Sequence, residues 1–227
     1  MNLRVKICGI TRPEDALAAV EAGADAIGFV FVAESPRAID VDRAAAIARA
    51  LPPFVARVGV FADTPREVME ETARRAGLHC LQLHGDETPE ACAAIRLPWY
   101  KAHRVGSGFD PALVRRWGGT AFLLDAAAPG IRGGSGRAFD WGVALAAGAF
   151  GRVILAGGLT PDNVASAVVR ARPWAVDVSS GVEETPGRKR RDLMALFIER
   201  ARAAAARIDG DAAAIAGRGG VTQGGPT

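Results

Sequence analysis

Short apolar runs alternate with Ala- and Leu-rich segments along most of the chain, and this alternation constrains the fold more than any other feature. Each run is bounded by turn residues, which is typical of strands buried on both faces of a parallel sheet. We interpret the segments between the runs as amphipathic helices. The predicted strands are residues 5–8, 26–31, 57–61, 80–84, 99–105, 122–125, 153–156 and 175–179.

Eight strands, each followed by a helix, predict an α/β fold, a closed (β/α)₈ barrel of the TIM type, with residues 1–207 forming a single domain. An open doubly wound sheet is disfavoured, because no Gly-x-Gly-x-x-Gly fingerprint follows the first strand. Residues 208–227 are rich in Gly and Ala and are predicted to be a disordered appendage.

Several predicted helices begin with a threonine near a proline. Residues 11–14 (Thr-Arg-Pro-Glu) and 64–67 (Thr-Pro-Arg-Glu) fit a capping box, in which threonine satisfies a free backbone N–H group. Thr88-Pro89 and Thr160-Pro161 share this entry without the glutamate. The basic run at residues 188–191 is interpreted as the solvated start of the last helix.

Composition excludes several classes of partner. The formal net charge of +3 is too small to indicate nucleic acid, and no basic stripe interleaves with aromatic residues. Three cysteines without metal-type spacing predict a reducing compartment and no metal site. With neither a signal peptide nor a long apolar span, we expect no membrane contact and a cytoplasmic location.

Cys8 is the first candidate catalytic residue, because it ends the first strand, where a barrel delivers side chains to its active site. Lys6 lies two residues earlier and therefore on the same face of the strand. A nearby ammonium group is expected to lower the pKa of the thiol toward the reactive range. Cys80 and Cys92 are interpreted instead as small buried apolar residues.

The ends of other predicted strands supply further polar candidates. Asp125 follows two leucines at the end of the sixth strand, and desolvation there is expected to raise its pKa, which suits a general acid. Asp177 on the eighth strand is predicted to lie within about 6 Å of Lys6, because these strands become neighbours when a barrel closes. The fourth strand supplies Gln82 and His84.

His84 and Cys80 are not expected to share a metal ion. Four residues along a strand span about 13 Å, which is too far for one ion to bridge. A structural or substrate-orienting histidine is the better interpretation.

Glycines after the last two strands indicate a phosphate site. Gly157 and Gly158 follow the seventh strand, and Ser180 and Gly181 follow the eighth. Loops at these positions often bind phosphate in this fold, so a small phosphorylated substrate is expected. Residues 133–136 (Gly-Gly-Ser-Gly) have two open interpretations, a mobile lid over the site or a plain flexible connection.

Short motifs from Val5 to about Arg202 together resemble the phosphoribosylanthranilate isomerases of tryptophan biosynthesis. One departure is Arg190, where the family more often has an acidic residue at a position that is not catalytic. The matching segments are residues 6–11 (KICGIT), 28–31 (GFVF), 35–37 (SPR), 58–61 (VGVF), 82–85 (QLHG), 123–126 (LLDA), 133–136 (GGSG), 139–141 (FDW), 155–159 (LAGGL) and 177–183 (DVSSGVE).

The resemblance implies a cofactor-free Amadori rearrangement of N-(5-phosphoribosyl)anthranilate. It implies that Asp125 protonates the ribose ring oxygen as general acid and that Cys8 removes the C2 proton as general base. Arg37 would bind the anthranilate carboxylate, for which a guanidinium fork is well shaped. The remaining implied substrate-binding residues are Gln82, His84 and Asp177.

The residues speak against two alternatives. The related aminoaldose isomerase of histidine biosynthesis would have an aspartate in place of Cys8. A non-catalytic barrel that binds a phosphorylated ligand would need neither Cys8 nor Asp125. The oligomeric state, monomer or homodimer, is not predicted.

Overall fold

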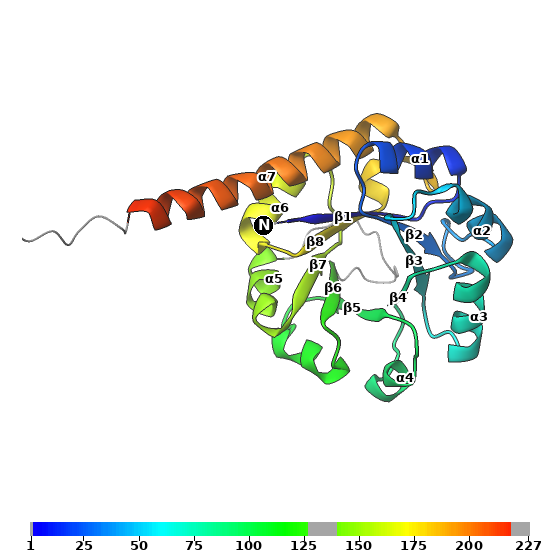
Figure 1. The fold of residues 1–227 in the computed structure, drawn as a ribbon. Helices are drawn as coiled ribbons and strands as arrows, with labels where there is room; N and C mark the ends of the chain where they lie inside the picture. Colours follow the sequence, from blue (N-terminus) through cyan, green and yellow to red (C-terminus); the bar gives the residue numbers. More distant parts are fainter. Residues whose placement is uncertain (1, 127–139, 219–227) are drawn as a thin grey trace, which may run out of the picture.

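The computed structural model describes residues 2–126 and 140–218 (Figure 1). The glycine-rich segment at residues 133–136 therefore lies outside the described residues. Among the described residues, no helix is long and apolar enough to cross a membrane.

Eight parallel strands form one closed barrel in sequential order, and β1 pairs with β8 to close it (Figure 1). This confirms the predicted (β/α)₈ fold. In the closing pair, Lys6 is in register with Asp177. The strands are β1 (Arg4–Cys8), β2 (Ala26–Val30), β3 (Ala56–Phe61), β4 (Cys80–Leu83), β5 (Trp99–Val105), β6 (Ala121–Ala126), β7 (Arg152–Leu155) and β8 (Ala175–Val178).

Helices surround the barrel, with a 3₁₀ helix rather than an α-helix between β5 and β6. A small antiparallel hairpin of β9 (Glu183–Thr185) and β10 (Arg188–Lys189) follows β8. The α-helices are α1 (Pro13–Glu21), α2 (Val41–Ala50), α3 (Arg66–Ala76), α4 (Pro89–Ala93), α5 (Trp141–Ala147), α6 (Val164–Ala171) and α7 (Arg191–Arg218). The 3₁₀ helices are η1 (Pro111–Trp117), η2 (Gly148–Phe150) and η3 (Ser180–Val182).

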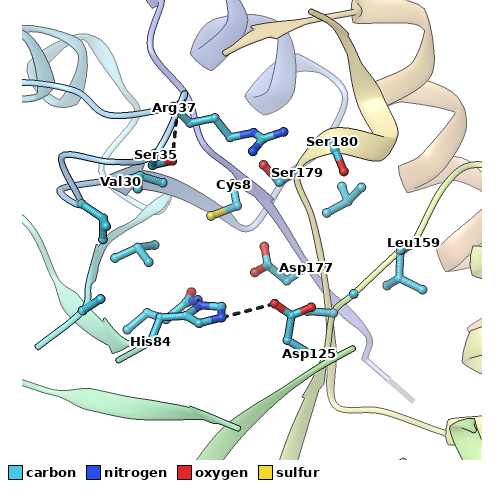
Figure 2. A pocket seen from close by; sticks show the side chains of 18 residues that line it. Cys8, Val30, Ser35, Arg37, His84, Asp125, Leu159, Asp177, Ser179 and Ser180 are labelled. Carbon is cyan, nitrogen blue, oxygen red and sulfur yellow. Dashed lines mark hydrogen bonds and ion pairs between the residues drawn. The ribbon is translucent and has the colours of Figure 1, made fainter. Parts of the chain in front are cut away.

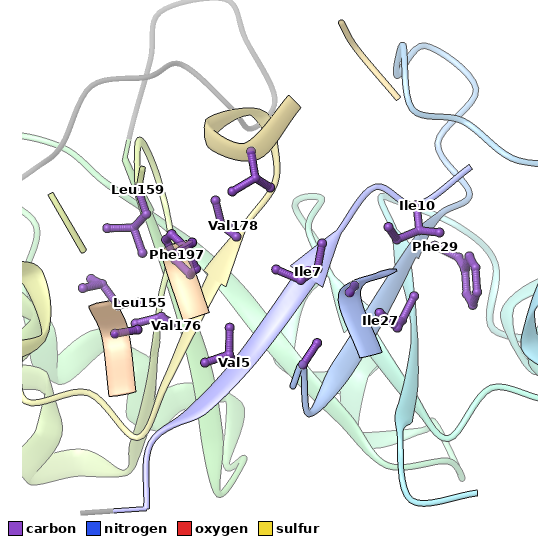
Figure 3. Close-up of a cluster of buried hydrophobic side chains, with 14 of the residues drawn as sticks. Val5, Ile7, Ile10, Ile27, Phe29, Leu155, Leu159, Val176, Val178 and Phe197 are labelled. Carbon is purple, nitrogen blue, oxygen red and sulfur yellow. The ribbon is translucent and has the colours of Figure 1, made fainter. Parts of the chain in front are cut away.

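Strand periodicity separates two environments. On β1, Val5 and Ile7 face outward into the layer between sheet and helices, where Phe197 of α7 also packs (Figure 3). The alternate residues, Lys6 and Cys8, face the barrel interior. Each fully buried large apolar side chain of the outer layer contributes about 1.5–3 kcal/mol. Apolar packing between the sheet and the helices stabilises the barrel, so the interior face of the strands can hold polar side chains.

The predicted capping boxes are wrong. The N-cap residues are Arg12 for α1 and Pro65 for α3, each one residue after the threonine that was predicted to cap the helix. No described side chain caps either helix. Thr11 instead donates its hydroxyl to the carbonyl oxygen of Gly187, 2.6 Å away. Thr88 does cap α4, accepting from the backbone N–H of Ala91.

The last helix differs from its prediction at both ends. Only the last residue of the basic run opens it, because Arg188 and Lys189 form β10 and α7 begins at Arg191. At the other end, α7 continues through Ile208 to Arg218 and extends beyond the barrel (Figure 1). Alanine has the highest helix propensity, which favours a helix in this Ala-rich segment. Residues 219–227 lie outside the described part.

His103 lies on the outer face of β5, where its ring contacts Trp117, Phe109 and Phe122. Its side chain is buried, and Nε2 has no hydrogen-bond partner among the described residues. Burial lowers the pKa of His103 to about 4. The folded protein therefore holds this imidazole neutral at pH values where the unfolded chain protonates it.

The free energy of unfolding is expected to fall as the pH drops from about 6.5 toward 4. Over this window the unfolded state binds a proton at His103 and the folded state does not, so stability is complete above the window and decreases through it. Between pH 7.5 and 5 the expected loss from this group is about 2 kcal/mol. Urea unfolding at both pH values measures it. His103→Phe should remove this part of the pH dependence, and an unchanged dependence in the variant would contradict the assignment.

Candidate active site

A cavity of about 120 Å³ opens at the carboxyl ends of the strands (Figure 2). Cys8 of β1 and Asp125 of β6 both line it, so the two predicted catalytic residues face one space. Of the other candidates, Arg37, Gln82, His84, Asp177, Gly157, Gly158 and Ser180 also line the cavity. Gly181 is not part of its lining.

Cys8 is 7 % exposed and packs beside Val30 and Val60. It fits inside the barrel because its partner in register on β2 is Gly28. A Cβ at Gly28 would lie 2.7 Å from the sulfur of Cys8 and 3.0 Å from Cε of Lys6. This glycine therefore makes room for both interior side chains of β1.

The expectation of a lowered thiol pKa is wrong in sign. Burial raises the pKa of Cys8 above its usual value, although the ammonium groups of Lys6 and Lys189 act in the opposite direction. Asp177 raises it further and offsets part of the effect of Lys6. The sequence predicted both Lys6 and its carboxylate partner Asp177, but not that burial of the thiol would outweigh the effect of the ammonium groups.

Lys6 and Asp177 form the predicted pair, with Nζ and Oδ2 2.8 Å apart and both side chains buried. Burial opposes the charge on Lys6, but Asp177, Cys8 and Tyr100 together outweigh it and raise the pKa of Lys6 well above its usual value, with Asp177 contributing most of the three. The second oxygen of Asp177, Oδ1, is buried and has no hydrogen-bond partner among the described residues. It is an acceptor at the wall of the cavity.

Gln82 links this pair to the other side of the site. Its Oε1 accepts from Lys6 Nζ and from the Tyr100 hydroxyl, both at 2.9 Å. Its Nε2 lies 2.8 Å from Nδ1 of His84. Buried hydrogen-bond networks of this kind fix side-chain orientation when their members are paired. Gln82 thereby sets the position of the His84 ring.

His84 and Asp125 lie side by side in the wall of the cavity, with Nε2 3.2 Å from Oδ2 (Figure 2). This distance is within ion-pair range, but the geometry is not that of a hydrogen bond, since Nε2 has no such partner among the described residues. Asp125 is 5 % exposed.

Arg37 enters the site from the loop after β2 and makes a bidentate contact with Glu183. Nε lies 2.9 Å from Oε1, and Nη2 lies 2.7 Å from Oε2. Glu183 Oε1 also accepts from Lys189 Nζ at 2.7 Å. Burial disfavours the Glu183 carboxylate, but Arg37 and Lys189 outweigh it and lower the pKa of Glu183.

Sequence reasoning missed Glu183 and Lys189 as site residues. Glu183 ended a motif but was given no role, and Lys189 was read as part of a solvated basic run. The fully buried Lys189 side chain shows that this run is not uniform. The alternation of β10, with Arg188 exposed and Lys189 buried, is the signal that could have separated them.

The loops after β7 and β8 bring glycines to the cavity, and Gly157 and Gly158 line it. Gly157 and Gly158 have φ of +80° and +67°, in the left-handed region that favours glycine. A Cβ at Gly157 would lie 2.7 Å from Oδ1 of Asp125, and one at Gly181 would lie 1.9 Å from the carbonyl oxygen of Leu159. These close approaches require glycine at both positions.

No group of three or more His, Cys, Asp or Glu side chains could hold a metal ion within residues 2–126 and 140–218. Cys80 is half-buried on β4 and does not line the cavity. Cys92 is buried on α4.

Residues 5–200 match the family model for N-(5'-phosphoribosyl)anthranilate isomerase. The chain belongs to the phosphoribosylanthranilate isomerase family. A curated relative, the N-(5'-phosphoribosyl)anthranilate isomerase of Geobacter sulfurreducens, is 54 % identical over 202 residues, covering 88 % of this chain and 98 % of the relative. The chain is therefore an enzyme, an isomerase of the aldose–ketose type from tryptophan biosynthesis.

Solved phosphoribosylanthranilate isomerase structures share the fold. The structure from Thermotoga maritima is 44 % identical, with a TM-score of 0.84, and the match covers 88 % of this chain and 99 % of that one. A second structure, 43 % identical with a TM-score of 0.81 and the same coverage, is a complex with reduced 1-(o-carboxyphenylamino)-1-deoxyribulose 5-phosphate. That isomerase thus binds a compound with a phosphate and an aromatic carboxylate.

Proposed function

We propose that this protein rearranges N-(5-phosphoribosyl)anthranilate to 1-(2-carboxyphenylamino)-1-deoxy-D-ribulose 5-phosphate, with Asp125 as general acid and Cys8 as general base. The observation that carries the proposal is that Cys8 and Asp125, from β1 and β6, line one cavity at the carboxyl end of the barrel. A base and an acid facing one space are what an intramolecular proton-transfer reaction needs.

The reaction consists of two proton transfers by the protein, followed by a tautomerisation. Asp125 donates a proton to the ribose ring oxygen, the C1–O bond breaks, and the nitrogen lone pair forms the C1=N bond of a protonated Schiff base. Cys8 then removes the C2 proton, and the electron pair moves through C1 to nitrogen, giving an enolamine. Tautomerisation returns a proton to C1 and leaves a ketone at C2. C2 is oxidised to a ketone while C1 is reduced within the same molecule, so the chemistry requires no external redox cofactor.

The anthranilate end of the substrate would lie on the Arg37 side of the cavity. Val30, Val32 and Val60 provide apolar wall there, suited to an aromatic ring. The edge of Arg37 that Glu183 leaves free has donors for a carboxylate. The ring and its carboxylate would thus meet matching chemistry on one side of Cys8.

The phosphate would lie on the side of the β7 and β8 loops. The backbone N–H groups of Gly157, Gly158, Ser180 and Gly181 have no hydrogen-bond partner among the described residues, and the first three residues line the cavity. Donors of this kind suit phosphate oxygens. Asp177 Oδ1, also unpartnered, would accept from a sugar hydroxyl. His84 and Gln82 would orient Asp125 and the sugar.

The decisive experiment follows the fluorescence of freshly prepared N-(5-phosphoribosyl)anthranilate, which is lost as the substrate is converted. The purified full-length protein is expected to accelerate that loss, and a Cys8→Ser, Asp125→Asn double variant serves as the control. No acceleration over the control would reject the proposed function. The aminoaldose substrate of the histidine-pathway isomerase, tested in parallel, checks the related activity.

Arg37→Ala is expected to raise KM by about tenfold or more while changing kcat much less. A hydrogen bond to a charged group contributes about 1.5–3 kcal/mol, and a contact made in both ground and transition states affects binding rather than turnover. Steady-state kinetics measure both constants. Arg188→Ala removes an exposed arginine from the neighbouring hairpin and should change neither. An unchanged KM in Arg37→Ala would reject the carboxylate contact.

A further inference from the structure

Arg37 is held on one edge only. Glu183 occupies Nε and one N–H of Nη2, with Nε also 3.2 Å from Oε2. A guanidinium group has five N–H donors in a rigid plane, so three remain, two of them on Nη1. Nη1 makes no hydrogen bond to any other described residue, and Arg37 lines the cavity. The geometry fixes the plane of the guanidinium and leaves its outer edge available.

Glu183 alone would cancel the charge that makes Arg37 useful. Its carboxylate neutralises one cation, and a neutral pair attracts an anion only weakly. Lys189 changes this balance, because its ammonium contacts the same carboxylate at 2.7 Å. The three groups carry two positive charges and one negative charge. A net positive charge therefore remains beside the cavity.

This trio is shielded from solvent. The side chains of Arg37, Glu183 and Lys189 are 15 %, 5 % and 0 % exposed. Electrostatic interactions are much stronger at such positions than in water. Neither Glu183 nor Lys189 lines the cavity, so both can act on a ligand only through Arg37 or through the field of the trio.

The hairpin that carries Glu183 and Lys189 is anchored to Asp15 and Thr11, which do not line the cavity. The backbone N–H of Lys189 donates to Asp15 of α1 at 3.0 Å, and Gly187 is bound by Thr11. Lys189 Nζ also donates to the carbonyl oxygen of Ser179 at 3.2 Å. A rigid support of this kind keeps a binding group in place before the ligand arrives, which reduces the ordering cost of binding.

We propose that Glu183 and Lys189 are positioning residues that make Arg37 selective for a substrate with an aromatic carboxylate: Glu183 fixes the guanidinium edge, and Lys189 restores the net positive charge. This inference rests on the proposed function, because it concerns the anthranilate end of that substrate.

The test compares two ligands by calorimetry with the full-length protein. One is reduced 1-(o-carboxyphenylamino)-1-deoxyribulose 5-phosphate, and the other is the same compound without the ring carboxyl group. Glu183→Gln and Lys189→Met are each expected to raise the Kd of the carboxylated ligand about tenfold or more, which is the scale of a charged hydrogen bond. The Kd of the other ligand should rise less than about twofold. In turnover, both variants should raise KM with little change in kcat.

The matched control is Glu184→Gln, since Glu184 lies next to Glu183 in the hairpin but is exposed and pairs with Arg188. It should affect neither ligand. Glu183→Asp is the second variant: it keeps the charge but draws the carboxylate away from Arg37, and the same selective loss is expected. Thermal unfolding checks that each variant is folded.

The sign of the Glu183→Gln result is itself informative. If net charge alone governed binding, removing a carboxylate beside Arg37 would make the carboxylated ligand bind more tightly. The positioning role would be overturned if Glu183→Gln bound the carboxylated ligand more tightly or with unchanged affinity, or if both ligands lost affinity equally. It would also be overturned if the wild type bound the two ligands with the same affinity. The binding measurement does not depend on turnover. If the wild type binds the ligands as expected but does not convert the substrate in the fluorescence assay, the proposed function is rejected and the positioning role is not.

Discussion

Cys8→Ser is expected to lower kcat at least about 10²-fold, the usual scale for a positioned base. Serine fits the space that Gly28 leaves for Cys8, so the fold should be preserved. Its hydroxyl is a far weaker acid than a thiol, so the ionised form that accepts a proton from carbon is much rarer. Burial already raises the pKa of Cys8, which makes the thiolate costly even in the wild type. Steady-state turnover of the anthranilate substrate measures the loss.

The matched control for this prediction is Cys80→Ser, the same substitution at a half-buried cysteine outside the cavity. Its kcat should stay within about twofold of the wild type. A substrate deuterated at C2 adds a second measurement, because slowing the step that breaks the C2–H bond should expose a full primary isotope effect in Cys8→Ser. Turnover near the wild-type value would remove Cys8 from the role of base.

The barrel and the outline of its site could be predicted because both follow from strand periodicity. Residues two apart share a face, so Lys6 and Cys8 had to point the same way. Closure of eight parallel strands then made β1 and β8 neighbours, which brought Lys6 and Asp177 together from distant parts of the sequence. The same geometry places Cys8 and Asp125 in one cavity at the carboxyl ends of the strands.

The features that were missed depend on contacts between elements rather than on periodicity. The pKa of Cys8 follows from the balance of burial, Lys6 and Asp177, and no sequence spacing reports that balance. Thr11 looked like a helix cap, but its hydroxyl binds the hairpin at Gly187 instead. Lys189 looked solvated within a basic run, although the hairpin buries it. Tertiary contacts decided each of these cases.

Asp125→Asn is expected to lower kcat at least about 10²-fold as well, but at a different step. The amide has nearly the same shape as the carboxyl group and cannot donate the acidic proton that ring opening requires. His84 lies 3.2 Å from the Asp125 carboxylate and cannot take over this role without moving. Asp86→Asn is the control, because Asp86 is exposed and its nearest ion-pair partner, Arg104, is 3.7 Å away.

The C2-deuterated substrate separates the two catalytic roles. If Asp125 opens the ring before Cys8 acts, slowing ring opening in Asp125→Asn makes that step rate-limiting, and the C2 isotope effect on kcat should fall toward one. The same substrate should give a full isotope effect in Cys8→Ser. Equal isotope effects in both variants would mean that the two residues act in one step. A large effect in Asp125→Asn alone would require the acid and base assignments to be exchanged.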